Sequence, residues 1–107
     1  MPEATVFEIS TIDEYNYLKA TYPRLVVDCG ATWCGPCRMI APLIQQWADT
    51  YTNVQFAKAD IDSGDLADNL GITAVPTLFF IKNGTTKIFK GADVASLTSL
   101  VVATASD

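Results

Sequence analysis

The spacing of apolar residues along this chain changes repeatedly, and each change predicts a new strand or helix. Residues 25–27 form a continuous apolar run, LVV, which is typical of a central parallel strand covered on both faces. In residues 34–51 the apolar positions recur at helical spacing instead, with Pro42 expected to kink that helix. Asn83 and Gly84 separate two β-type segments and predict a hairpin turn. The predicted strands are residues 5–9, 25–27, 54–61, 77–82 and 86–90, and the later helices are residues 34–51, 63–70 and 94–103.

A capping-box pattern predicts one further helix near the start of the chain. Thr11 and Glu14 stand three residues apart ahead of an amphipathic segment, and Pro23 closes this unit. The elements then follow in the order βαβαβαββα. Parallel neighbours need crossover helices and a hairpin pair is antiparallel, so this order predicts an α/β fold with a central five-stranded mixed sheet flanked by four helices. No repeat or linker interrupts the pattern, and we expect residues 1–107 to form a single domain.

Composition and charge exclude several classes of function. The 107 residues include seven basic and twelve acidic side chains, a net charge of −5 and no histidine. Nucleic-acid binding relies on clustered Lys and Arg, so we expect no nucleic-acid partner. Without histidine the chain cannot use a Ser-His or Cys-His nucleophile or a histidine metal ligand.

The two ends of the chain and its hydropathy bear on where the protein works. Residues 1–8 lack the basic stretch and long apolar run of a secretory signal, and no segment approaches the length of a membrane span. Residues 105–107 form no retrieval or prenylation signal. We therefore expect a cytoplasmic protein that does not associate with a membrane.

Two of the three cysteines have a spacing that supports redox chemistry. Residues three apart share a helix face, so Cys34 and Cys37 in a first helical turn can bring their sulfurs within bonding distance. The helix N-terminus should lower the pKa of Cys34, whereas Cys37 should be more buried and less reactive. Pro36 suits an early helical position, and Gly35 lets a partner chain approach the sulfur closely.

The residues alone leave other interpretations of this pair open. A CxxC segment can be half of a zinc site, although the two further soft ligands are hard to find with no histidine and one other cysteine, Cys29. A metal could also be held by CxxC pairs from two chains. Alternatively, the domain could be a binding subunit whose thiols are incidental.

The run VVDCGATWCGPCRMIAP at residues 26–42 closely resembles the thioredoxin family, and the resemblance extends over nearly the whole chain. It implies the thioredoxin fold and a protein disulfide reductase that works by dithiol–disulfide exchange. It also implies regeneration by an NADPH-dependent, flavin-containing thioredoxin reductase, with no cofactor and no metal bound by this chain. The Phe56 strand and the Gly91-Ala92 pair are most similar to eukaryotic cytosolic members. The other matching segments are FAKADID at 56–62, GITAVPT at 71–77, KNG at 82–84 and GA at 91–92.

The resemblance assigns roles to four residues. Cys34 would attack the substrate disulfide and Cys37 would resolve the mixed disulfide. Asp28 would accept the Cys37 proton, since a buried carboxyl has a raised pKa, although a strand-end Asp satisfied by backbone N–H groups is the alternative. Lys58 would lie near Asp28 and tune its pKa, or would simply be an exposed lysine at the sheet edge. The Gly-Pro dipeptide between the cysteines resembles that of reductases rather than the Gly-His of disulfide isomerases.

The resemblance also implies a docking surface for disulfide-containing protein substrates. A cis Val75–Pro76 bond would face the cysteines and leave the Val75 backbone free to pair with an extended segment. Ordinary loop packing is the alternative explanation for these residues. We expect the protein to act as a monomer. The implied substrate-binding residues are Trp33, Gly35, Pro36, Val75, Pro76, Gly91 and Ala92.

Two positions beside the motif depart from the family pattern. Thioredoxins usually carry two aromatic residues where this chain has Cys29 and Gly30. Such truncation costs on the order of a few kcal/mol unless neighbours fill the space, and Tyr15, Tyr17 and Met39 are the candidates. A buried Cys29 would be an inert apolar group, whereas an exposed one could be glutathionylated and have a regulatory role.

Overall fold

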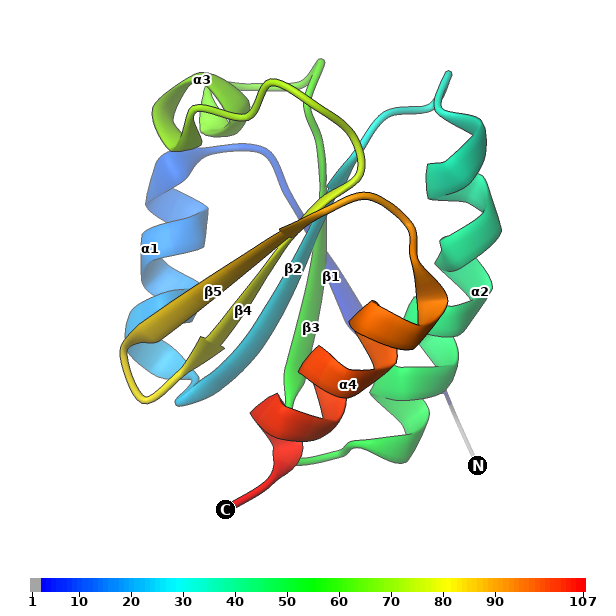
Figure 1. The fold of residues 1–107 in the computed structure, drawn as a ribbon. Coiled ribbons are helices and arrows are strands. Elements are labelled where there is room, and N and C mark those ends of the chain that lie inside the picture. Colours follow the sequence, from blue (N-terminus) through cyan, green and yellow to red (C-terminus); the bar gives the residue numbers. More distant parts are fainter. Residues whose placement is uncertain (1–2) are drawn as a thin grey trace.

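Residues 3–107 are described by a computed structural model, in which a five-stranded sheet has helices on both faces (Figure 1). The strand order is β1-β3-β2-β4-β5; β1, β3 and β2 run parallel, and β4 runs antiparallel to both of its neighbours. The predicted α/β fold with four helices is confirmed. Its elements are β1 (Val6–Ile9), α1 (Ile12–Thr21), β2 (Arg24–Gly30), α2 (Gly35–Thr50), β3 (Gln55–Asp60), α3 (Leu66–Leu70), β4 (Thr77–Lys82), β5 (Thr85–Lys90) and α4 (Val94–Ala105).

The central strand β2 is buried on both faces, as its apolar run predicted. Successive side chains of a strand point to opposite faces. Val27 packs with residues of α1 and α3 on one face, whereas Val26 packs with residues of α2 and α4 on the other. Trp47 of α2 also belongs to the second cluster. The sheet is therefore covered on each side by two helices (Figure 1).

Helix α1 begins with the predicted capping box. The Thr11 hydroxyl oxygen accepts a hydrogen bond from the Glu14 N–H at 3.1 Å, and the Glu14 carboxylate accepts one from the Thr11 N–H at 3.1 Å. Two N–H groups that the helix leaves unpaired are thereby satisfied. The local sequence thus fixes where this helix starts.

Helix α3 is shorter than predicted. It begins at Leu66 rather than at residue 63, because Gly64 adopts the left-handed region with φ of 65° and interrupts the helical path. The helix ends where expected, at Gly71 in the left-handed conformation. The predicted hairpin turn is also present, with Asn83 and Gly84 at φ of 50° and 85°.

One end of the sheet gathers the loops that carry the sequence motifs. The loops after β2 and after β3 and the loop ahead of β4 lie at the upper end in Figure 1, and the C-terminus lies at the lower end. Helix α2 starts at this upper end and continues through Pro42 without a break. Among residues 3–107, no helix has the length and apolar character needed to cross a bilayer. The structure does not describe Met1 and Pro2, which begin the segment predicted to lack a secretory signal.

Candidate active site

The two motif cysteines are held where β2 passes into α2. Strand β2 ends at Gly30, a turn follows in which the Cys34 N–H donates to the Ala31 carbonyl at 3.2 Å, and α2 begins at Gly35. Cys34 and Cys37 form a disulfide with their Cα atoms 5.3 Å apart. The spacing that predicted a bonded pair is therefore realised in the first turn of α2.

The surroundings of Cys34 favour a thiolate. Cys34 is the N-cap residue of α2, and its Sγ accepts a hydrogen bond from the Cys37 N–H at 3.2 Å. No acidic residue lies in the first turn of this helix, and Pro36 has no N–H to compete for an acceptor. An N–H donor and the positive end of a helix dipole both stabilise negative charge on sulfur. When the disulfide opens, these contacts favour negative charge on the Cys34 sulfur.

The prediction that Cys37 is more buried than Cys34 is wrong in this disulfide form. Cys34 is 5% exposed and Cys37 is 9% exposed, so both are buried and Cys37 is not the more buried one. The sulfurs pack with Ala31, with Val75 and Ile61 beside them. The chemical difference between the two thiols therefore comes from the N-cap position of Cys34 and not from burial.

Asp28 lies in β2 as a buried acid without a partner. It is 8% exposed, and its Oδ1 makes no hydrogen bond. Burial raises the pKa of Asp28 from 3.8 to about 6, against a smaller lowering by the charge of Lys58. Backbone N–H groups therefore do not satisfy Oδ1, and the alternative interpretation of Asp28 as a strand-end carboxylate paired with the backbone is wrong for this oxygen. An acid with this pKa can take up and release a proton near neutral pH.

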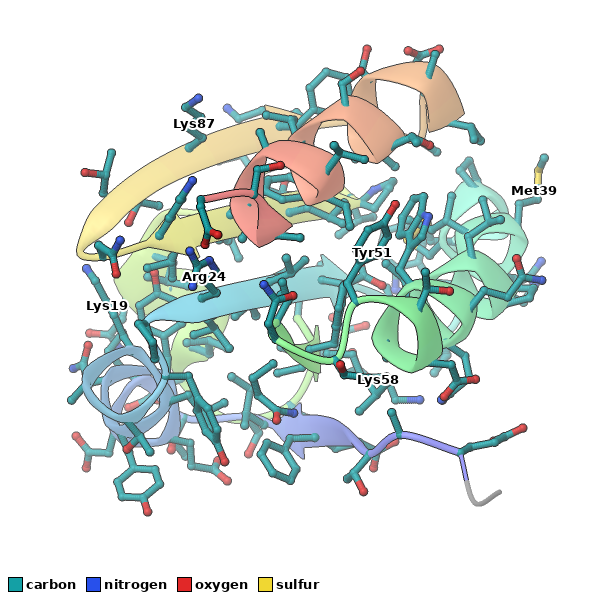
Figure 2. The ribbon with its side chains drawn as sticks, turned by 90° about the horizontal axis from the view of Figure 1, so that it is seen from below. Lys19, Arg24, Met39, Tyr51, Lys58 and Lys87 are labelled. Atoms are coloured by element: carbon teal, nitrogen blue, oxygen red, sulfur yellow. A yellow bond between two sulfur atoms is a disulfide. The ribbon has the colours of Figure 1, made fainter. Side chains whose placement is uncertain are left out.

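Lys58 is both an exposed lysine and a neighbour of Asp28. The two residues stand opposite each other in the β2–β3 register, and Glu8 stands opposite Lys58 on β1. The Lys58 Nζ lies 3.2 Å from the Glu8 carboxylate, and more than half of the Lys58 side chain is exposed. Figure 2 shows it between β1 and α2. Both interpretations of Lys58 therefore hold in part, because its charge lowers the pKa of Asp28 from a solvated position.

The Val75–Pro76 peptide bond is cis, as the family resemblance implied. Val75 is half-buried and packs against the two cysteines. The Pro76 carbonyl accepts the Gly91 N–H at 2.9 Å, which ties the loop ahead of β4 to the loop after β5. Pro76 itself is less than 2% exposed, so the structure differs from the expectation that its ring belongs to the docking surface. Pro76 therefore supports the loop from inside the molecule.

The exposed residues around the disulfide match the other expected docking positions. Trp33 is 65% exposed, and its indole N–H donates to the Asp62 carboxylate at 2.9 Å. The Arg38 guanidinium donates to the Thr32 carbonyl at 2.8 Å and braces the same loop. The sequence alone does not mark Asp62 or Arg38 as part of the site, because Asp62 reaches Trp33 from another loop and the Arg38 guanidinium bonds only to a backbone oxygen. Among the remaining positions, Pro36 is exposed, and Gly35, Gly91 and Ala92 are half-buried.

Cys29 and Gly30, the two small residues beside the motif, differ in how closely their surroundings are packed. Cys29 is fully buried in the cluster beneath α1, where Tyr15 also lies and packs edge-on to Phe79 with ring centroids 6.0 Å apart. Of the three residues expected to fill the space left by the small Cys29 and Gly30 side chains, Tyr15 therefore packs in the same cluster as Cys29. Tyr17 and Met39 are exposed, and Figure 2 shows Met39 extending away from α2.

The space beside Gly30 stays open. A cavity of about 550 Å³ lies there, and Asp28, Gly30, Cys37 and Lys58 are among the residues that line it. Within residues 3–107, no group of three or more His, Cys, Asp or Glu side chains is arranged to hold a metal ion. The chemistry this arrangement offers is thiol–disulfide exchange with an acid close by.

Comparisons with known proteins agree with this site. The thioredoxin family model matches residues 7–103. Thioredoxin-1 of Saccharomyces cerevisiae is 39% identical over 103 residues, which cover 94% of this chain and 99% of that protein. The thioredoxin of Coprinus comatus is 40% identical over 98 residues, which cover 87% of this chain and 92% of that protein.

Solved structures show the same fold. The crystal structure of the Malassezia sympodialis thioredoxin superimposes with a TM-score of 0.88 at 34% identity, covering 99% of this chain and 96% of that one. The oxidised form of mitochondrial thioredoxin 3 from Saccharomyces cerevisiae gives a TM-score of 0.85 at 32% identity, covering 92% of this chain and 94% of that one. With its Cys34–Cys37 disulfide at the start of α2, the chain belongs to the thioredoxin family of protein disulfide oxidoreductases.

Proposed function

We propose that this chain reduces protein disulfides with Cys34 as the attacking thiolate and Cys37 as the resolving thiol. The observation that carries this assignment is the N-cap position of Cys34, whose sulfur accepts the Cys37 N–H. A donor N–H at a helix N-terminus stabilises negative charge on the Cys34 sulfur, and the thiolate is the nucleophile in disulfide exchange.

The reaction proceeds by two exchange steps. The Cys34 thiolate attacks one sulfur of the substrate disulfide, forms a mixed disulfide and expels the other substrate sulfur as a thiolate. Cys37 then attacks the Cys34 sulfur and releases the second substrate thiol. Two electrons pass to the substrate, and the enzyme is left with the Cys34–Cys37 disulfide found here. In this scheme the structure corresponds to the oxidised end of the cycle.

Asp28 is proposed as the proton acceptor for Cys37 in the second step. Its unpartnered Oδ1, its pKa of about 6 and its position on the same cavity as Cys37 all support this role. A group with this pKa is largely ionised at neutral pH and ready to take a proton. Lys58 is proposed as a positioning residue that holds the Asp28 pKa below the value burial alone would give.

Substrate docking is proposed to use the exposed rim of the disulfide. Neither backbone group of Val75 makes a hydrogen bond within residues 3–107, so its N–H and carbonyl are available to an extended segment. Pro76 acts here by fixing the direction of Val75. The other proposed contact residues are Trp33, Gly35, Pro36, Gly91 and Ala92.

Membership of the thioredoxin family implies disulfide substrates and a thioredoxin reductase as general partners. We further propose that the reductase is NADPH-dependent, and that the chain works as a single-domain monomer in the cytoplasm without a cofactor of its own. Size-exclusion chromatography tests the monomeric state, and cell fractionation tests the location. Association with nucleic acid is not expected from a net charge of −5.

Insulin reduction coupled to NADPH and thioredoxin reductase tests the assignment of the two cysteines. Wild-type protein should turn over, Cys34→Ser should abolish turnover and form no mixed disulfide through position 34, and Cys37→Ser should accumulate a mixed disulfide on Cys34. Cys29→Ser is the matched control and should retain activity, because Cys29 is fully buried away from the pair. An inactive wild type would favour the binding-subunit interpretation, and stoichiometric zinc or iron in elemental analysis would favour a shared metal site.

A further inference from the structure

A cavity of about 550 Å³ opens beside the disulfide, and none of the proposed docking residues lines it. It lies at the carboxyl ends of the parallel strands β1, β2 and β3 and is closed on one side by the first turns of α2, which contribute Cys37, Arg38 and Ala41. In open α/β sheets, ligands bind outside the carboxyl ends of the strands. Its volume is also within the range of small-molecule sites, roughly 300–1,000 Å³.

Cys37 reaches the wall of this cavity because residue 30 is glycine. A Cβ atom at position 30 would lie 3.1 Å from the Cys37 Sγ, so any side chain there would press against the sulfur and occupy the space in front of it. Cys37 lines the cavity, whereas Cys34 is not among its lining residues. A molecule in the cavity therefore meets the second cysteine of the pair and not the first.

The cavity also presents polar groups of both signs. Asp28 is more than nine-tenths buried, lines the cavity and has an Oδ1 without a partner, so it offers an acceptor to an incoming N–H. Lys58 and Arg38 place cationic groups at the walls, and Glu8 and Asp60 add carboxylates. A ligand with amide N–H groups, a carboxylate and an ammonium group would complement this set.

We propose that this cavity is a binding site for a small peptide thiol, which exchanges with Cys37 rather than with Cys34. The site rests on the redox chemistry of the Cys34–Cys37 pair but does not require Asp28 to act as the proton acceptor. It adds a second class of exchange partner to a pair whose protein substrates are proposed to react at Cys34.

The exchange balances as two successive displacements. A peptide thiolate attacks the Cys37 sulfur, forms a new S–S bond to it and expels Cys34 as a thiolate, while the proton of the incoming thiol passes to solvent. Cys34 is the favourable leaving group, because its N-cap position stabilises the thiolate and a thiol of lower pKa leaves faster. A second peptide thiolate then attacks the peptide sulfur, releasing the peptide disulfide and the Cys37 thiolate. The peptide loses two electrons and the enzyme pair gains them.

Oxidised glutathione, used as the probe, tests the reverse of the second displacement, in which the Cys37 thiolate attacks the glutathione disulfide, takes up one glutathionyl group and releases the other as a thiolate. Reduced full-length Cys34→Ser and Cys37→Ser variants are each mixed with oxidised glutathione, and adduct formation is followed by mass spectrometry with fragmentation to locate the modified sulfur. We expect a glutathione adduct on Cys37 in the first variant. Finding no Cys37 adduct, while Cys34 of the second variant reacts, would overturn the proposal.

Ala41→Phe, added to both variants, separates the cavity from general reactivity. Ala41 is exposed and lines the cavity, so a phenyl group there should fill part of the space without disturbing the core. The adduct rate at Cys37 should fall roughly tenfold, which corresponds to about 1.4 kcal/mol, and the rate at Cys34 should not change. Equal slowing at both cysteines, or no slowing at Cys37, would contradict the site.

Two further variants keep the test decisive. Gln46→Phe places the same side chain at an exposed position of α2 that does not line the cavity, and should change neither rate. Ser63→Phe fills the cavity from the loop after β3 and should also slow the adduct at Cys37. It replaces Ala41→Phe if circular dichroism shows that the Ala41 variant folds poorly. In an otherwise wild-type background, Ala41→Phe should leave insulin reduction unchanged. Loss of insulin reduction in wild-type protein would instead count against the proposed function.

Discussion

Asp28 is buried in surroundings that disfavour its charge. It stands at the end of a buried strand with one carboxylate oxygen unpaired, and the ionised form is disfavoured by burial. Lys58 offsets part of this cost from a solvent-exposed position. A proton acceptor beside Cys37 needs a pKa near neutrality, and burial supplies it at the expense of folding free energy.

The pH dependence of stability should therefore carry the signature of Asp28. Its folded pKa of about 6 exceeds the ordinary value of 3.8, so the folded state binds the proton more tightly and stability falls as pH rises from near 4 to above 6. This difference in pKa corresponds to a loss of about 3 kcal/mol at pH 8. Asp28→Asn should thus raise the free energy of unfolding at pH 8 by up to about 3 kcal/mol, and by less than about 1 kcal/mol at pH 4.

Guanidinium denaturation of the oxidised proteins at the two pH values provides the measurement. Asp13→Asn, at an exposed position of α1, is the control and should show no comparable gain. A stability gain for Asp28→Asn that is the same at both pH values would show that ionisation of Asp28 is not the cause.

Cys29 should be inert in the folded protein. It is fully buried, and burial together with the nearby charge of Asp28 raises the pKa of its thiol to about 12. At pH 7 almost no thiolate is present to react. After reduction and treatment with iodoacetamide or mild peroxide, mass spectrometry should find modified Cys34 and unmodified Cys29. Modification of Cys29 at a rate similar to that in denatured protein would restore the regulatory interpretation.

At the scale of elements, the ends of helices decide both local stability and chemistry. The same unpaired N–H groups are satisfied by a Thr side chain at α1 and by a Cys sulfur at α2. The capping box of α1 could be predicted from two residues because all of its partners are local. The short length of α3 could not, since it depends on the backbone of Gly64 and on the contact of the Leu66 N–H with the Ser10 carbonyl from another loop.

Thr11→Ala should therefore destabilise the protein by about 1 kcal/mol, because it removes the acceptor for the Glu14 N–H. Chemical denaturation of the wild type and the variant gives the value. Ser99→Ala, at an exposed position inside α4 with no side-chain hydrogen bond among residues 3–107, is the matched control and should change stability by less than about 0.5 kcal/mol. Equal effects of the two substitutions would mean that the cap contributes nothing specific.

At the scale of the whole molecule, the sequence predicted the order and type of every element, because apolar spacing and turn residues act locally. It also predicted the Cys34–Cys37 pair and the buried acid. It did not predict that Cys37 is no more buried than Cys34, or that Pro76 lies beneath the surface. Both depend on how loops from separate strands pack together. The cavity beside Gly30 also depends on how separate segments pack. The sequence shows that residue 30 has no side chain, but it does not show whether neighbouring residues fill the space.

Whether the protein reduces or oxidises its substrates depends on the reduction potential of the Cys34–Cys37 pair, because a reductase must form its own disulfide more readily than the substrate does. Members of the thioredoxin family act as protein disulfide oxidoreductases, and the Gly35-Pro36 dipeptide resembles that of reductases. A reductase needs a potential well below that of the disulfide isomerases.

The most direct test of this account is the equilibrium reduction potential of the Cys34–Cys37 pair, measured against glutathione buffers with alkylation and mass spectrometry as the readout. We predict a value of about −270 mV, the potential typical of thioredoxins. A value of about −180 mV, as in protein disulfide isomerase, would contradict the assignment as a reductase.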